Sequence, residues 1–260
     1  RRGPGLIAMG KTGSWVALRQ PRGDASRRLF CFPHAGGGAT AYRRWVTAFP
    51  GDLEVCPVQL PGREQRLREP PFHSMETLLE PLLAGLLPWL DRPFSFFGHS
   101  MGAAIAFELA HQLRAMGLPT PQRLLVSGRR APGRAGHDEI TYHLPDDAFL
   151  DKLAELKGSP REVLDNAELM ALMLPMLRAD FQLIETYRGK SDRLPLDCPL
   201  TVFGGVDDPK ASREDLLAWE ELSRGPFRLQ MFAGGHFYFQ QDLAPLLEAV
   251  QRELTAAVLS

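Results

Sequence analysis

Short apolar runs alternate with longer amphipathic segments along most of this chain. Runs of strand length lie at 29–32, 53–58, 94–97, 123–127, 200–203 and 227–232. Segments with helical periodicity lie between or after them, at 42–49, 75–90, 101–116, 213–222 and 243–258. Continuous apolar runs are typical of strands that are buried on both faces. The alternation therefore predicts an α/β fold, with a mostly parallel sheet and helices on both of its faces.

Between about 129 and 195 this alternation stops. The stretch contains helix signals but no convincing strand. Helix starts are indicated at 145–147 and 159–162, because a proline or a side-chain acceptor suits the first, unpaired amides of a helix. The segment 169–174 is apolar on nearly every side. We therefore expect a helical insertion into the α/β domain.

Length and composition favour one domain. The chain has 260 residues, of which 44% are hydrophobic and 23% charged, and this suits one large core. We expect a flexible segment at 1–27 and the domain at 28–260. A net charge of −1 provides no general attraction for nucleic acid. The longest apolar stretch, 78–90, is interrupted by a glutamate and two prolines, so no membrane span is expected.

The three cysteines are Cys31, Cys56 and Cys198, and they lack the spacing of metal ligands. Unpaired cysteine behaves as a small hydrophobic residue. We expect buried free thiols in a reducing cytoplasm, and no bound metal.

The most specific motif is Gly98-His99-Ser100-Met101-Gly102, between the apolar run 94–97 and the helical segment 101–116. A strand that turns sharply into a helix holds its central residue in a strained conformation and exposes it, as in a nucleophile elbow. Ser100 is therefore the candidate nucleophile. The amide of Met101 lies at the positive end of the helix, where it can stabilise a developing oxyanion.

A serine nucleophile needs a base and a group that orients the base. His236 follows the last predicted strand in a glycine-rich loop, and among the seven histidines only its place in the chain suits the order serine, acid, histidine. The acid candidates are Asp207 and Asp208, after the strand at 200–203. We favour Asp208 because it stands just before the turn proline.

A second oxyanion donor is expected in the glycine-rich loop 33–38, after the first predicted strand. Its three glycines allow the backbone to approach a substrate, and the amide of Ala35 is the favoured donor. No Gly-Lys-Ser/Thr follows the loop, so it does not fit a phosphate-binding loop.

Together these motifs resemble the type II thioesterases, the stand-alone editing hydrolases of polyketide and nonribosomal peptide synthesis. The resemblance covers roughly 28–255 and rests on the loop 32–37, the segment 59–64, the elbow, the segment 234–238 and the helical segment 174–181. It implies an α/β-hydrolase fold and a Ser100–His236–Asp208 triad that forms an acyl-enzyme. The implied substrate is an acyl group on the phosphopantetheine arm of an acyl or peptidyl carrier protein, with no cofactor of the enzyme's own.

The resemblance also gives the insertion an interpretation. The insertion is expected to be a lid, in which Met170, Met173 and Met176 line an adaptable acyl channel. The alternative is a set of helices packed on the body, and the two can hold together. A cytoplasmic monomer is expected.

Carrier proteins are generally acidic, so basic residues near the entrance are candidates for docking. The two candidate clusters are Arg63, Arg66 and Arg68, and Arg129, Arg130 and Arg134. Arg178 and Asp180 are expected as an internal pair of the lid.

Three other functions remain open. A cyclising thioesterase would release a ring with the same triad, and a general carboxylesterase would apply the same chemistry to a different acyl carrier. A catalytically silent α/β-hydrolase binding module is disfavoured, because such a module has no need for serine, acid and histidine together.

Overall fold

The fold is built on one sheet of six parallel strands. The computed structural model describes residues 14–134, 139–156, 158, 161–190 and 192–256. The strands are β1 (Arg27–Phe32), β2 (Leu53–Pro57), β3 (Phe94–His99), β4 (Leu124–Ser127), β5 (Leu200–Gly205) and β6 (Phe227–Phe232). Their order across the sheet is β2-β1-β3-β4-β5-β6, and every neighbouring pair is parallel. The predicted α/β-hydrolase architecture is confirmed.

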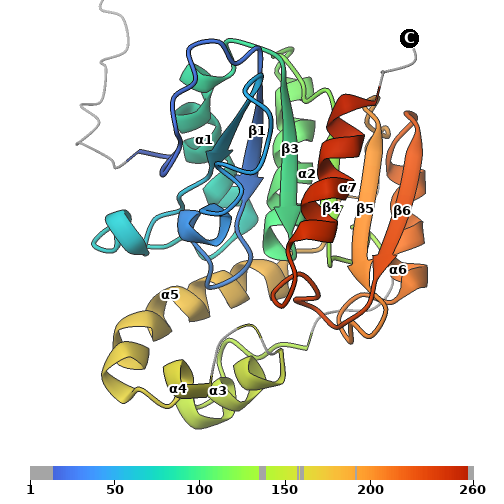
Figure 1. Cartoon of the computed structure of the whole chain (residues 1–260). Helices are drawn as coiled ribbons and strands as arrows, with labels where there is room; N and C mark the ends of the chain where they lie inside the picture. The colour runs from blue at the N-terminus through green and yellow to red at the C-terminus, as the bar shows by residue number, and fades with distance from the viewer. Residues whose placement is uncertain (1–13, 135–138, 157, 159–160, 191, 257–260) are drawn as a thin grey trace, which may run out of the picture.

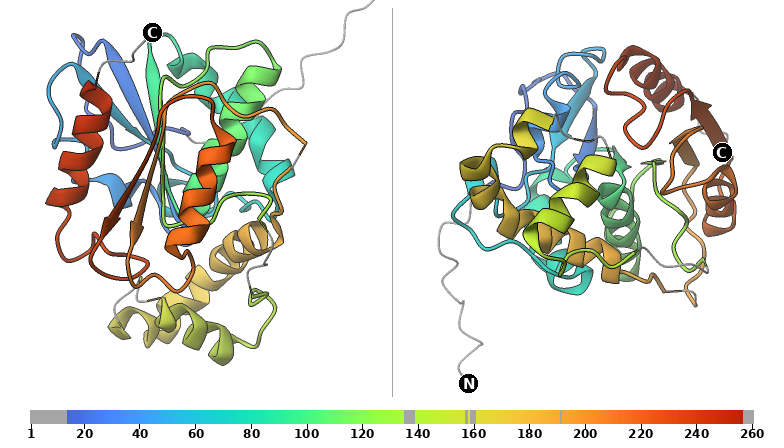
Figure 2. Two further views of the ribbon diagram at one scale, coloured as in Figure 1. Left: turned by 90° about the vertical axis from the view of Figure 1, so that its right-hand side faces the viewer. Right: turned by 90° about the horizontal axis from the view of Figure 1, so that it is seen from below.

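Helices cover both faces of this sheet (Figure 2). The α-helices are α1 (Met75–Leu86), α2 (Met101–Ala115), α3 (Asp146–Glu155), α4 (Arg161–Leu164), α5 (Ala167–Thr186), α6 (Arg213–Leu217) and α7 (Ala244–Thr255). The 3-10 helices are η1 (Ala39–Tyr42), η2 (Glu64–Arg66), η3 (Leu87–Trp89) and η4 (Ala218–Leu222). In Figure 2, α2 and α6 lie on the opposite side of the sheet from α7.

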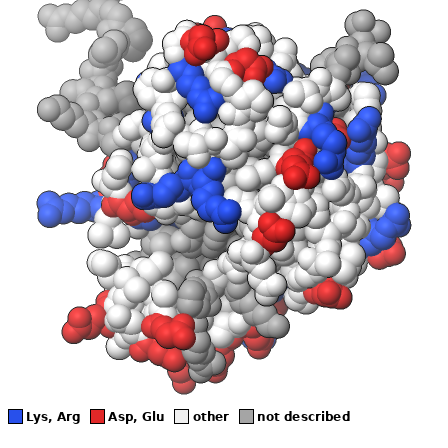
Figure 3. Space-filling view, in the orientation of Figure 1, with Lys and Arg blue, Asp and Glu red and all other residues white. Residues whose placement is uncertain are grey.

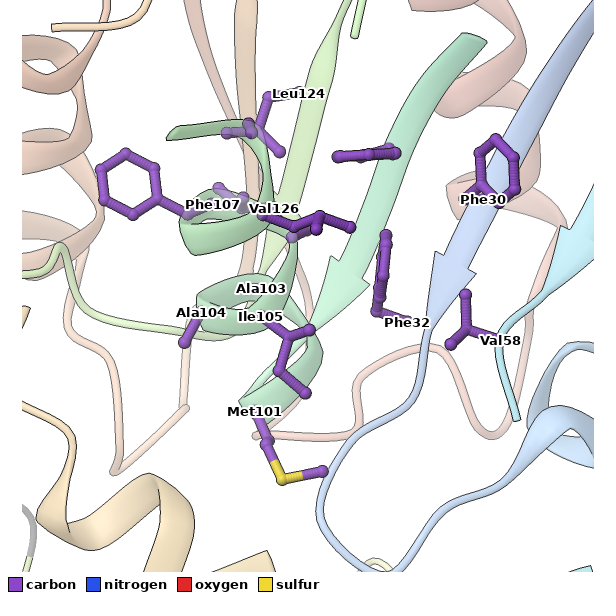
Figure 4. Close-up of a cluster of buried hydrophobic side chains, with 14 of the residues drawn as sticks. Phe30, Phe32, Val58, Met101, Ala103, Ala104, Ile105, Phe107, Leu124 and Val126 are labelled. Atoms are coloured by element: carbon purple, nitrogen blue, oxygen red, sulfur yellow. The ribbon is translucent and has the colours of Figure 1, made fainter. Parts of the chain in front are cut away.

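Alternate strand residues divide between two cores. Phe30 and Phe32 of β1 pack with α1 and α2 on one face, in the cluster drawn in Figure 4. Leu29 and Cys31 of the same strand pack on the other face with α7 and the segment 42–49. Because both faces are buried, each central strand is apolar at successive positions.

The described residues of the predicted insertion form three helices with turns and loops between them, and no strand. Helices α3, α4 and α5 lie below the strand arrowheads in Figure 1, at the carboxyl end of the sheet, and share a separate apolar cluster. Asp146 begins α3 directly after Pro145, as expected. Residues 159 and 160 of the second predicted helix start lie outside the described residues, although α4 begins at Arg161. The insertion therefore forms a cap over the sheet's carboxyl edge, which we call the lid.

The N-terminal segment differs from the expected flexible one where it is described. Residues 1–13 lie outside the described residues. From Trp15 to Ala17 the chain is buried, and Val16 forms a bridge with Val58 beside β2. Trp15 also stacks on Phe72. An indole of this size buries enough apolar surface to hold the segment on the body.

All three cysteines are free, as expected. Cys31 and Cys56 are buried, and burial raises the pKa of Cys56 to about 12. Cys198 is partly exposed, unlike the other two. Among the helices that the structure describes, none is long and apolar enough to span a membrane.

The strand order places a crevice beside β1. The chain runs from β1 outward to β2 and then returns to β3 on the other side of β1. Loops that leave β1 and β3 therefore diverge to opposite faces, and open α/β sheets bind ligands at such a switch point. The loop after β1 is the predicted oxyanion loop, and the loop after β3 carries Ser100.

Candidate active site

Ser100 occupies a strained turn between β3 and α2. Its φ is 55° and its ψ is −114°, a conformation that costs a residue with a side chain about 1–3 kcal/mol. The Ser100 amide donates to the Ser127 carbonyl at 2.8 Å, which ties the turn to β4. The Ser100 side chain lines a cavity at the carboxyl edge of the sheet.

Two glycines make this turn possible. A Cβ atom on Gly98 would collide with the carbonyl group of Gly102, and one on Gly102 would collide with the carbonyl oxygen of Phe32. The first contact lets α2 fold back closely on β3. The second brings the N-terminus of α2 against the end of β1, so that Met101 lies near the loop that begins at Pro33.

His236 and Asp208 meet at the same edge of the sheet. The Nδ1 atom of His236 lies 2.9 Å from Oδ2 of Asp208, and both residues are more than nine-tenths buried. The amide of Lys210 donates to the other carboxylate oxygen of Asp208 at 2.8 Å. Asp207, the alternative acid, is exposed and its amide donates to the Gly234 carbonyl. Asp208 is therefore the aspartate that contacts the histidine.

The loops that carry these two residues pack closely because they are rich in glycine. A Cβ atom on Gly205 would collide with the carbonyl oxygens of Gly234 and Gly235. This approach sets the distance between the acid and the histidine. His236 also lines the cavity that contains Ser100, and its Nε2 atom remains on the side of the ring away from Asp208.

Ala35 lies in the same cavity, on the loop after β1. Within the described residues, the amides of Ala35 and Met101 have no hydrogen-bond acceptor, whereas those of Gly36, Gly37 and Ser100 are all paired. Two amides that lack an acceptor beside a nucleophile are suited to binding an oxyanion.

Two further histidines, His99 and His34, lie beside the site, and the sequence did not indicate a role for either. The ring of His99 lies 4.9 Å from that of His236, and Nδ1 of His99 contacts the Ser127 hydroxyl at 2.9 Å. Burial, together with the charge of His236, lowers the pKa of His99 well below its usual value. Burial also lowers the pKa of His34 to about 4, with smaller effects from His236 and Arg63. Both rings are therefore neutral at pH 7.

A second cavity continues from the first beneath the lid. Among the described residues, the two cavities share five lining residues, which are His34, Ala35, Leu156, Phe181 and Phe237. Met170 and Met173 line the second cavity, and Met176 is buried in the lid's own apolar cluster instead. An apolar chamber therefore extends from Ser100 under the lid, lined by two of the three predicted methionines.

The structure corrects the expectation for the first arginine cluster. Arg63 and Arg66 are 4% and 3% exposed, so neither is available to a docking partner. Arg63 forms a bidentate pair with Asp180, at 2.6 and 2.7 Å. Arg66 pairs with Glu69 and lies over the Trp15 ring. Only Arg68 of the three is exposed.

The expected pair of Arg178 and Asp180 is also wrong. Arg178 pairs with Asp146 of α3 at 2.5 Å, and Asp180 pairs with Arg63. Residues 178 and 180 point to different sides of α5, because two positions correspond to about 200° of helical rotation. A sequence signal for a buried Asp180 was present: it shares a helix face with Leu177 and Ile184, and a lone acid on an apolar face needs a buried partner.

Comparisons with known proteins agree with this geometry. The Thioesterase domain family model matches residues 27–255. The gramicidin S biosynthesis protein GrsT of Aneurinibacillus migulanus is 39% identical, over 96% of this chain and 97% of its own length. The structure of the type II thioesterase BorB from the borrelidin biosynthetic cluster is 36% identical, with a TM-score of 0.84 over 94% of this chain and 100% of BorB. RedJ, a thioesterase of the prodiginine pathway in Streptomyces coelicolor, is 36% identical, with a TM-score of 0.83 over 96% of this chain and 91% of RedJ.

Proposed function

Since the chain belongs to the thioesterase family, we propose that it removes acyl groups from the phosphopantetheine arm of acyl or peptidyl carrier proteins by hydrolysis. In this role it would clear stalled or wrongly primed units from a polyketide or nonribosomal peptide synthase. The similarity to type II thioesterases over nearly the whole chain supports this substrate class. The observation that carries the proposal is the Asp208–His236 hydrogen bond, beside a cavity that also contains Ser100.

Acylation begins with Ser100. Its Oγ attacks the thioester carbonyl carbon while Nε2 of His236 takes the hydroxyl proton. Asp208 fixes the imidazole with its proton on Nδ1 and stabilises the imidazolium that forms. The amides of Met101 and Ala35 hold the oxyanion. Collapse of the tetrahedral intermediate then breaks the C–S bond, and the imidazolium of His236 gives its proton to the leaving sulfur, so that His236 is again neutral. The sulfur leaves readily because the pKa of a thiol is about 8.5, so the step requires less acid assistance than cleavage of an amide.

Deacylation repeats the chemistry with water. His236 removes a proton from water, which attacks the ester carbonyl, and the oxyanion returns to the same two amides. Collapse of the tetrahedral intermediate breaks the Ser100–acyl bond, and His236 returns the proton to Oγ. The product is a free carboxylic acid.

The apolar chamber suits an enzyme with broad acyl selectivity. Methionine side chains are flexible, so Met170 and Met173 can adapt to acyl groups of different shape. One methylene group changes discrimination in an apolar pocket by only about 1–3 kcal/mol. Low selectivity of this kind is what an editing enzyme requires.

Surface charge favours one approach of an acidic carrier protein. Acidic side chains gather over the lid at the bottom of Figure 3, and several basic ones lie on the body above it. An acidic partner is therefore repelled from the outer face of the lid. With Arg63 and Arg66 buried, the second predicted cluster, Arg129, Arg130 and Arg134, is the better candidate. Arg129 lines the Ser100 cavity together with Lys210, and Arg134 is exposed.

Ser100→Ala tests the chemistry. We expect hydrolysis of acyl-pantetheine thioesters to fall by roughly 10³-fold or more, because the nucleophile is lost while the fold is kept. The measurement is release of free thiol, with circular dichroism as the control for folding. Undiminished turnover by a folded variant would remove the mechanism.

A panel of acyl groups loaded on one carrier protein tests the substrate. Mass spectrometry of the carrier and of the product distinguishes the functions left open by the sequence. Release of free acids from many acyl types supports editing, and ring products would indicate a cyclising enzyme. Cleavage of simple esters in preference to the loaded carrier would indicate a general carboxylesterase.

A further inference from the structure

The buried carboxylate of Asp180 joins the lid to the loop that carries Ala35. Asp180 lies on α5 and is 2% exposed. Its Oδ2 atom accepts a hydrogen bond from the Gly36 amide at 2.8 Å and another from Nη1 of Arg63 at 2.6 Å. Gly36 directly follows Ala35. The lid is thus bonded to the residue next to the proposed oxyanion donor.

Arg63 holds the other side of the same loop. Its Nη1 atom also donates to the Gly37 carbonyl at 2.9 Å, and its Nε atom donates to the Pro61 carbonyl at 3.2 Å. Asp180 and Arg63 therefore fix an amide and a carbonyl of two successive loop residues. The two side chains are 117 residues apart in sequence and meet only through the fold.

Close packing reinforces these bonds. Gly36 has a φ of +79°, and a Cβ atom there would lie 2.6 Å from Cδ2 of Leu177, one turn before Asp180 on α5. At the other end of the loop, a Cβ atom on Gly38 would collide with the Glu64 carboxylate, which accepts a hydrogen bond from the Thr40 amide. Gly36 and Gly38 are thus needed because α5 contacts the loop at one end and Glu64 contacts it at the other.

Stability alone does not explain this ion pair. Burying two charges costs a desolvation free energy that is about as large as the gain from their attraction. Apolar side chains of similar size therefore often give a folded protein that is equally stable. What an apolar pair would lack is an acceptor for the Gly36 amide and a donor to the Gly37 carbonyl. The directed hydrogen bonds are the property that only this pair supplies.

We propose that Asp180 and Arg63 are positioning residues that hold the Ala35 amide in place for the oxyanion, and that α5 is in this way a fixed part of the active site. The inference rests on the proposed function. It assigns two roles to the lid: its methionines contact the acyl group, and its Asp180 sets the geometry of the oxyanion loop. Any opening movement of the lid must leave the end of α5 that carries Asp180 in place, and Figure 1 shows α5 directly beneath the strand ends.

The test compares Asp180→Asn with wild type, using a small acyl-pantetheine thioester. Two inhibitors are added: a trifluoromethyl ketone, whose adduct with Ser100 places a negative oxygen in the oxyanion site, and an acyl carboxamide, which resembles the ground state. We expect kcat to fall by about 10- to 100-fold, since loss of one whole oxyanion donor costs about 10²- to 10³-fold. Affinity for the ketone should fall by a similar factor. KM and carboxamide affinity should change by less than about 3-fold, because the acyl chamber is intact.

Two further variants distinguish a positioning role of the ion pair from a role in the stability of the fold. Arg63→Met/Asp180→Leu replaces the ion pair with apolar side chains and leaves no buried unpaired charge, so it should stay folded. Its melting temperature should fall by a few degrees, because the Gly36 amide and the Gly37 carbonyl lose their partners, and it should still show the loss in kcat. Asp146→Asn is the matched control, because it removes the exposed lid pair with Arg178 without touching the loop. It should keep wild-type kcat within about 2-fold.

The possible failures are distinguishable. A folded double variant with wild-type kcat and ketone affinity would overturn the positioning role while leaving the thioesterase mechanism intact. Equal losses of ketone and carboxamide affinity would make Asp180 a determinant of substrate binding instead. Failure of the wild-type enzyme to cleave thioesters, or full activity of Ser100→Ala, would count against the proposed function itself.

Discussion

Asp207 and Asp208 are neighbours with very different surroundings. The carboxylate of Asp208 is fully buried and bonded to His236 and to the Lys210 amide, whereas Asp207 is exposed. The sequence order and the turn proline favoured Asp208, and the geometry gives the reason. After Gly205 the chain turns toward the Gly234-Gly235 loop, and only the third residue beyond it reaches the histidine.

Asp208→Asn should therefore impair turnover far more than Asp207→Asn. An amide at 208 donates to Nδ1 of His236, which moves the ring proton to Nε2 and leaves no base for Ser100. We expect kcat for a thioester to fall about 10²- to 10⁴-fold for Asp208→Asn and to stay within about 2-fold for Asp207→Asn. Steady-state kinetics of both variants measure this, and the reverse ranking would reassign the acid to Asp207.

At the scale of elements, local pattern predicted the six strands and the elbow, but several boundaries moved. The helix expected at 75–90 contains Pro81 but ends at Leu86, and a 3-10 turn that contains Pro88 follows. The segment 42–49 buries the face that its periodicity predicts, yet it is built from turns with i to i+3 hydrogen bonds such as Trp45 to Tyr42.

Side-chain pairs between elements that are distant in the chain could not be predicted from the sequence. The serine, acid, histidine and oxyanion loop each follow a strand, so a parallel sheet brings them to one edge and their order in the chain was informative. No periodicity relates Arg63 to Asp180, because their pairing depends on where α5 crosses the loop. The same limit explains why Arg63 and Arg66 were expected at the surface: charge alone does not indicate burial when the partner is unknown.

Gly102→Ala tests how the elbow holds two elements together. The added methyl group meets the Phe32 carbonyl, so α2 must move away from β1 and Met101 away from the Ala35 loop. We expect a loss of about 1–3 kcal/mol in the free energy of unfolding, with a fall in kcat of at least about 10-fold. Urea unfolding and thioester kinetics measure the two effects.

Gly51→Ala is the matched control for this variant. A Cβ atom there meets nothing within 4 Å and the backbone φ is not positive, so stability should change by less than about 0.5 kcal/mol. If Gly102→Ala behaves like this control in both measurements, the close approach of α2 to β1 is not what organises the site.

For the whole molecule, burial of neutral histidines makes stability depend on pH. The pKa of His34 is lowered to about 4, and that of His99 is lowered well below its usual value. Away from the active site, burial and then the charges of Arg193 and Arg114 lower the pKa of His111 to about 4, against the opposing effect of Glu108. Each of these rings must take up a proton more readily in the unfolded chain than in the folded one.

The free energy of unfolding should therefore fall as the pH drops from 6.5 toward 4. Unfolded histidine binds a proton near pH 6.5, whereas folded His34 and His111 do so only near pH 4 and the pKa of folded His99 is lowered well below its usual value, so protons favour the unfolded state in this window. Above pH 6.5 both states are neutral and the full stability is present. Between pH 7.5 and 5, His34 and His111 should each lower the free energy of unfolding by about 1–2 kcal/mol, before most carboxylates begin to titrate.

His111→Asn isolates one contribution at a residue outside the active site. An amide oxygen at 111 can accept the hydrogen bond that Arg114 donates to the ring, and asparagine does not titrate. Urea unfolding at pH 7.5, 6.5, 5.5 and 5 measures the free energy of unfolding at each pH. Between pH 7.5 and 5 this free energy should fall by about 1–2 kcal/mol less in the variant than in wild type. Kinetics at pH 7.5 should be unchanged, because His111 lies on α2 at the end remote from Ser100. Parallel slopes for the two proteins would mean that the His111 ring is protonated as easily in the folded state as in the unfolded chain.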